Sequence, residues 1–213
     1  MLEVYALFVK ICYGKIMKKL SIYLFLIFFN FHLPSYSNDL KEFIIEDMSI
    51  GDSLLDYISK EEIKKFNIDS NNNKVFKRIR LLSKDFSLLK TYDGMHIFID
   101  PNDKEYLIHG IEAMLVFEND ISNCIFKKDE ILNNISEIFK NNKMTTENKN
   151  HSQDKSGKSK TFKNFININP SSKYYELELA CYDWSEEMNF VDHFRISIIT
   201  DKVNDTLNRH SIN

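Results

Sequence analysis

The segment from Ile121 to Lys140 constrains the fold more than any other part of the chain. Its apolar residues recur at helical spacing, and charged or amide side chains occupy the opposite side. The apolar stripe consists of Ile121, Cys124, Ile125, Ile131, Leu132, Ile135, Ile138 and Phe139. A helix with one apolar side must pack on a sheet or on other helices. We therefore expect a long amphipathic helix here, with Ser122 as its cap.

Strand patterns occur both before and after this helix in the sequence. Alternation of apolar and polar residues is typical of strands with one buried face. It predicts strands at 74–82, 86–92, 95–99, 106–117, 161–168, 174–182 and 193–199. Asp93-Gly94 predicts a tight hairpin turn between the second and third of these, and Gly110 predicts a bend or bulge.

Cap signals predict short helices near residues 53–66 and 201–207. Asp52 or Ser53 can cap the first, and Ser59 with Glu62 forms a capping box for the next. Together these elements predict an α+β fold, an antiparallel sheet of about six strands with the long helix packed on it and short N-terminal helices.

Residues 141–160 contain Met144 as their only large apolar side chain. A segment this polar buries too little surface to order itself, so we interpret it as a mobile surface loop. Its Gly157-Lys158-Ser159 sequence is not a phosphate-binding loop, because Ser152 occupies the position where that motif needs glycine.

Residues 17–37 have the pattern of a secretory signal peptide. Lys18-Lys19 precedes the apolar stretch 20–31, and small residues, Ser35 and Ser37, follow a helix-breaking proline. The apolar stretch is short for a bilayer span. We therefore expect cleavage after Ser37, with a retained membrane anchor as the alternative.

The start of the chain and its mature part follow from this interpretation. Met17 is well placed to begin the signal peptide, so residues 1–16 are an over-extended start or a long positively charged region. Residues 38–213 form a single domain, for which we expect a periplasmic or secreted location and no stable membrane span after cleavage.

Export also predicts a disulfide. Signal cleavage removes Cys12 and leaves Cys124 and Cys181, an even pair in an oxidising compartment. Cys124 lies on the apolar stripe of the long helix, and Cys181 ends a predicted strand. A bond between them would fix the first turn of the helix to the sheet.

The charge balance excludes one class of partner. The chain has 28 Lys and Arg residues against 31 Asp and Glu residues, and its net charge is −3. Nucleic-acid binding requires a concentrated basic surface, which this composition does not provide.

The polar loop after the only tryptophan is the candidate binding loop. Its candidate residues are Asp183, Trp184, Glu186, Glu187, Asp192 and His193. In one interpretation Trp184 is a buried plug and the carboxylates are solvated. In the other, Trp184 is a ligand platform, and the carboxylates bind Ca²⁺ or act as acid and base.

Two histidines are weak metal candidates. A four-residue turn after Asp100 would place His96 opposite His109, close enough to share a metal ion. A register change of one residue would separate them, and no third ligand is evident. Two ordinary sheet histidines are the alternative, and we expect no cofactor.

Three segments together resemble a known family. They are Met48–Tyr57, Asp154–Ser159 and Cys181–Met188. In these segments the chain resembles small exported proteins of uncharacterised function from AT-rich marine bacteria. The resemblance implies export, and it implies no activity or catalytic residue.

The sequence therefore favours a non-enzymatic binding or interaction module. Its partner would be another envelope protein or a small ligand. The alternative is a small hydrolase-like exported enzyme that uses the acidic loop after Trp184. A deep pocket beside Trp184 that contains Asp183 and another convergent polar group would favour the enzyme, and a shallow apolar groove or an open sheet edge would favour the module.

Overall fold

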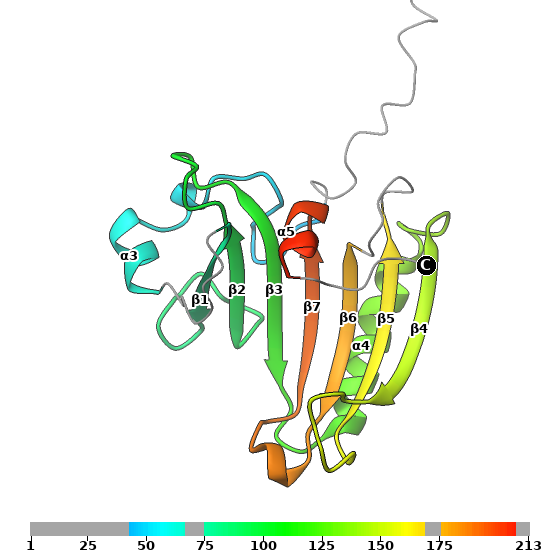
Figure 1. Cartoon of the computed structure of the whole chain (residues 1–213). Coiled ribbons are helices and arrows are strands. Elements are labelled where there is room, and N and C mark those ends of the chain that lie inside the picture. The colour runs from blue at the N-terminus through cyan, green and yellow to red at the C-terminus, as the bar shows by residue number, and fades with distance from the viewer. Residues whose placement is uncertain (1–42, 67–74, 169–175, 208–213) are drawn as a thin grey trace, which may run out of the picture. The chain divides into compact units, whose positions relative to one another are not determined.

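The computed structural model describes residues 43–66, 75–168 and 176–207. Their main element is one antiparallel sheet of seven strands in the order β1-β2-β3-β7-β6-β5-β4 (Figure 1). The strands are β1 (Lys77–Leu82), β2 (Gly94–Ile99), β3 (Ile108–Val116), β4 (Lys143–Asn150), β5 (Lys160–Asn167), β6 (Leu177–Asp183) and β7 (His193–Ile199). The predicted antiparallel sheet with helices is therefore confirmed, with seven strands instead of about six.

The helices among the described residues are short apart from α4. They are η1 (Leu54–Asp56), α3 (Lys60–Lys65), α4 (Ile121–Ser136), η2 (Glu186–Met188) and α5 (Asp201–Thr206). The predicted capping box of Ser59 and Glu62 is present at α3.

The long helix differs from the prediction at both ends. Its cap is Asp120 and not Ser122, because the Asp120 carboxylate accepts the Asn123 N–H at 3.1 Å. The helix stops at Ser136 and not at Lys140. The Ile138 N–H donates to the Ile135 carbonyl, three residues earlier in the chain. This spacing is that of a 3₁₀ turn, which is more tightly wound than an α-helix.

One face of the sheet forms the main core. Helix α4 packs against β6 and β7, and Figure 1 shows it running along the sheet behind β5 and β6. Apolar residues of segment 45–63 join the same core, among them Met48, Leu54 and Ile58. They pack with buried side chains of the central strands, including Ile97 and Ile111.

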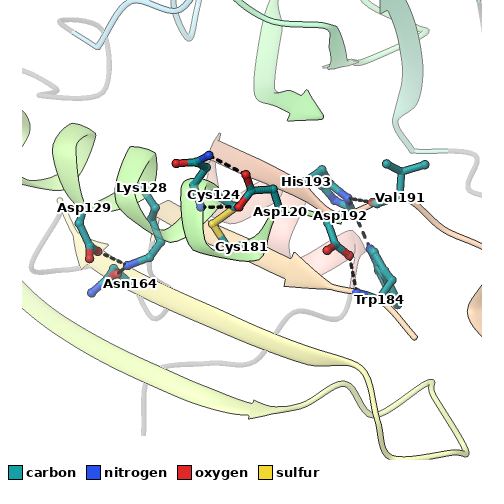
Figure 2. Close-up of a disulfide and its surroundings, with 11 residues drawn as sticks. Asp120, Cys124, Lys128, Asp129, Asn164, Cys181, Trp184, Val191, Asp192 and His193 are labelled. Atoms are coloured by element: carbon teal, nitrogen blue, oxygen red, sulfur yellow. Dashed lines mark hydrogen bonds and ion pairs between the residues drawn. A yellow bond between two sulfur atoms is a disulfide. The ribbon is translucent and has the colours of Figure 1, made fainter. Parts of the chain in front are cut away.

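A disulfide joins Cys124 of α4 to Cys181 of β6, with their Cα atoms 6.0 Å apart (Figure 2). The predicted pairing is therefore present. One turn further along α4, the buried Lys128 ammonium contacts Asn164 of β5 and Asp129 (Figure 2). These contacts attach the helix to the sheet at two successive turns.

In the described part of the chain, helix covers the opposite face only at one end. There Val203 of α5 packs with Phe76, Phe98 and Ile199 in a second small cluster. Figure 1 shows α5 on the side of the sheet opposite α4, at the end of β7. We call this side the open face.

Residues 86–92 do not form the predicted strand, and Asp93-Gly94 is not a two-residue hairpin turn. The chain between β1 and β2 is a loop that a carboxylate from elsewhere holds. Glu46 accepts the N–H groups of Lys90, Thr91 and Tyr92 at 2.6–3.0 Å. These backbone donors are satisfied without a neighbouring strand, so a side chain replaces the sheet ladder.

The interpretation of residues 141–160 as one loop is wrong for 143–150, which form β4. This edge strand pairs with β5 from Lys143 opposite Asn167 to Asn150 opposite Lys160. Its side chains are almost all exposed. Backbone pairing holds the strand with little apolar burial, so the apolar pattern on which the prediction depended is missing.

The expectations for residues 1–16 and for the signal peptide at 17–37 lie outside the described residues. Within the described part of the chain, no helix is long and apolar enough to cross a membrane.

Candidate functional site

Charged side chains gather on the open face, where alternate residues of each strand point away from the main core. Arg195 of β7 donates through Nη2 to Oε1 of Glu178 on β6 at 2.5 Å. Nζ of Lys163 on β5 and the Tyr182 hydroxyl each lie 3.4 Å from the same Oε1. Three donors from three strands therefore converge on one carboxylate oxygen.

A second carboxylate lies beside this group. Glu112 of β3 is buried and faces His96 of β2 in the strand register. His96 Nδ1 lies 3.5 Å from Glu112 Oε2, and the Ser197 hydroxyl lies 3.5 Å from Oε1. The floor of the open face thus places Glu112 of β3 and Glu178 of β6 on either side of Arg195 of β7, with Lys163 of β5 beyond Glu178 and His96 of β2 beyond Glu112.

Arg195 stays positively charged at the centre of this network. Burial opposes its charge, but the carboxylates of Glu178 and Glu112 outweigh that effect and hold the pKa of Arg195 above its ordinary value. Its guanidinium also lies 4.9 Å from the centre of the Tyr182 ring, a cation–π distance.

An aromatic cluster adjoins the charged floor. Trp184 stacks on Tyr182 with ring centroids 5.7 Å apart, and it contacts His151 at 4.4 Å and Phe190 at 4.9 Å. His193 stacks on Tyr182 at 4.7 Å. Burial is the main cause that lowers the pKa of both His151 and His193, which favours neutral imidazoles in this cluster.

The open face contains a cavity of about 1230 Å³ that reaches from β1 to β4. Its walls include the charged group of Arg195, Lys163 and Glu178 and the aromatic rings of Trp184 and Phe190. A volume above the usual 300–1,000 Å³ of small-ligand pockets leaves room for an extended ligand.

Asp154 holds in place the turn between β4 and β5, which lies beside the aromatic cluster. Its buried carboxylate accepts the N–H and hydroxyl of Ser159 and the hydroxyl of Ser185, at 2.6–2.9 Å. These bonds join the β4–β5 turn to the chain after Trp184, and His151 begins that turn. The pKa of Asp154 lies well below its ordinary range because the Ser159 and Ser156 groups stabilise the carboxylate.

The predicted binding loop contributes only part of its residues to the cavity. Trp184 and His193 line it, and the Trp184 indole nitrogen lies 3.4 Å from His193 Nδ1, which also contacts the Val191 carbonyl at 2.9 Å. Asp192 is buried and accepts the Trp184 backbone N–H at 2.7 Å, so it shapes the loop (Figure 2). Trp184 itself is half-buried.

The remaining acidic residues of that loop lie elsewhere. Glu186 and Glu187 are exposed and do not line the cavity, and Glu187 pairs with Lys158 at 2.5 Å. Asp183 also lies outside the cavity lining. Burial and the neighbouring Asp192 raise the pKa of Asp183.

His96 and His109 do not face each other. Strand β2 ends at Ile99 and β3 begins at Ile108, so the connection is longer than the expected four residues and His96 lies opposite Glu112. His109 packs against the Phe76 ring. The irregularity expected near Gly110 is present as a register shift between Phe98 and Ile99. Within the described residues, no group of three or more His, Cys, Asp or Glu side chains could hold a metal ion.

The sequence interpretation missed Arg195, Lys163, Glu178 and Glu112 as site residues. The sequence carries a signal for one of them, because Arg195 alternates with the apolar residues Phe194, Ile196 and Ile198 in the predicted strand 193–199 and so belongs to its other face. Their convergence depends on the pairing of strands that are distant in the sequence.

No family model matches the chain, and neither a curated protein nor a solved structure matches it.

Proposed function

We propose that the protein is an exported binding module and that its ligand site is the cavity on the open face. The observation that supports this proposal most is the cavity of about 1230 Å³ with charged, hydrogen-bonding and aromatic side chains from six strands around it. A large concave site with a few convergent polar groups is typical of ligand binding.

Export is part of the same proposal. Its support is the signal-peptide pattern of residues 17–37 and the disulfide between Cys124 and Cys181, which suits an oxidising compartment. We therefore propose a periplasmic or secreted location.

The acidic loop supports no catalytic proposal. Acid–base catalysis needs carboxylates within reach of a bound substrate, and Glu186 and Glu187 are exposed outside the cavity lining. We therefore propose no catalytic role for this loop.

A fragment titration followed by NMR tests the location of the site without assuming a ligand class. Neutral, anionic and cationic fragments are added to the isotope-labelled, disulfide-bonded protein. We expect amide shifts to concentrate on Arg195, Glu178, Lys163 and Trp184. Shifts concentrated on α4, or no shifts with any fragment, would contradict the proposal.

A further inference from the structure

The floor of the cavity changes from apolar to charged along one row of the strand register. Adjacent strands place these side chains side by side in the order Leu82, Gly94, Met114, Arg195, Ala180 and Lys163. The first three positions carry no charge and the last three include two cations. The change occurs between Met114 of β3 and Arg195 of β7.

Exposed apolar side chains continue the apolar half towards solvent. Val116 lies two residues beyond Met114 on the same face, and it is 46% exposed. Phe190 and Val191 precede β7 and are 57% and 50% exposed, and all three residues line the cavity. Apolar side chains at the wall of one cavity can bury the apolar part of a ligand.

The cationic half contains Arg195 and Lys163, which both contact Oε1 of Glu178. The other nearby carboxylate, Glu112, already contacts His96 and Ser197. Arg195 Nε is buried and has no hydrogen-bond partner among the described residues. A further acceptor would therefore be stabilised here.

Ala180 adds to this arrangement. It lies between Arg195 and Lys163 in the register and is fully buried. Its methyl group leaves both cationic side chains room to reach the cavity. At the β4 edge, Glu147 and Lys149 neutralise each other at 2.9 Å. Arg78 of β1 also lines the cavity, but it lies outside this row.

We propose that the cavity binds a small anionic amphiphile, with its anionic group at Arg195 and Lys163 and its apolar part on Leu82, Met114, Val116 and Phe190. This inference rests on the proposed function and names the ligand class for the same site. A carboxylate there would accept charge-assisted hydrogen bonds while the apolar half buries the hydrocarbon.

Trp184 provides the readout, because it is the only tryptophan and it lines the cavity. Its fluorescence is followed while the disulfide-bonded protein is titrated with laurate, 1-dodecanol or dodecyltrimethylammonium below their micellar concentrations. The three probes share one hydrocarbon chain and differ in charge. We expect saturable binding of laurate, and binding weaker by about tenfold or more for the other two.

Variants separate the charge from the packing. Lys163→Met keeps a long side chain and should weaken laurate binding by about tenfold while 1-dodecanol binding stays the same. The matched control is Lys158→Met, whose exposed lysine contacts Glu187 and does not line the cavity. If Lys163→Met does not fold, Phe190→Ala at the exposed rim should weaken laurate and 1-dodecanol binding alike.

Equal affinity for the three probes, a preference for the cation, or laurate binding unchanged in Lys163→Met would overturn the inference. Phosphatidylglycerol vesicles separate a single amphiphile from a membrane surface, and a response to vesicles without a response to laurate would also overturn it. If no probe binds while fragments still map to the open face, the ligand class is wrong and the proposed function stands. If fragments do not map there, the proposed function itself fails.

Discussion

Met114 and Arg195 are register partners across β3 and β7, and between them the open face changes from apolar to charged. Both side chains line the cavity. The two strands are far apart in the sequence and adjacent in the sheet. The amphipathic floor is therefore a product of the topology, since neither strand alone carries it.

Gly110 is required by close packing. A Cβ at this position would lie 2.6 Å from Ile199 Cγ2 and 3.0 Å from Phe98 Cδ2. We expect Gly110→Ala to lower the free energy of unfolding by about 1–3 kcal/mol, as overpacked cores do. Urea denaturation measures this loss.

The cause can be isolated by combining Gly110→Ala with Ile199→Ala, which removes the nearest clashing atom. The double variant should lose less stability than the sum of the two single losses. Strictly additive losses would show that the steric explanation is wrong.

The disulfide should account for much of the stability. It links residues separated by 57 positions, and closing such a loop stabilises a fold by about 4 kcal/mol in the chain-entropy model. We expect the Cys124→Ala/Cys181→Ala double variant to lose an amount of this order in urea denaturation. A variant as stable as the disulfide-bonded protein would refute the prediction.

Asp154 should make the stability dependent on acid pH. Folding lowers the pKa of this carboxyl, mainly through the Ser159 hydroxyl. The stabilisation is therefore present above pH about 4, the value of an unfolded aspartate, and is lost as the pH falls through the folded value. The stability difference between the wild-type protein and Asp154→Asn should shrink below pH about 4.

Denaturation at several pH values measures this difference. Limited proteolysis at neutral pH provides a second readout, because Asp154→Asn should release the turn 151–159 and increase cleavage there. A stability difference that stays constant down to acid pH would exclude the assigned role of the carboxylate.

Export predicts a defined N-terminus. Protein recovered from the periplasm or the medium should begin at or near Asn38, because Ser35 and Ser37 satisfy the cleavage pattern. N-terminal sequencing checks this. Recovery of a chain that still begins at Met1 or Met17 would rule out cleavage at this site.

Local signals in the sequence predicted much of the fold. The alternation in 193–199 matches β7, and the Ser59–Glu62 capping box matches the start of α3. These features depend on neighbouring residues, so periodicity and caps were sufficient to find them. The cysteine pairing spans 57 positions, and it followed instead from the even number of cysteines left after the expected signal cleavage.

The remaining features depend on distant partners. β4 is held by its backbone pairing with β5, and the loop before β2 is held by the Glu46 carboxylate. The site residues Arg195 and Glu178 become informative only when β6 and β7 are known to be neighbours. The sequence analysis expected the acidic residues of the loop after Trp184 to form the site, but the residues that this loop contributes to the cavity are mainly aromatic.

The most direct test of the open-face site compares two exposed phenylalanines. Phe190 at the cavity rim is 57% exposed and Phe126 on α4 is 71% exposed. Nile red, a neutral apolar dye, is titrated into the wild-type protein and into Phe190→Ser and Phe126→Ser. We expect saturable dye fluorescence that Phe190→Ser weakens several-fold, by about the cost of one lost aromatic contact, and that Phe126→Ser leaves unchanged. Loss of dye binding in Phe126→Ser with full binding in Phe190→Ser would contradict the account, because the apolar site would then lie on the helix.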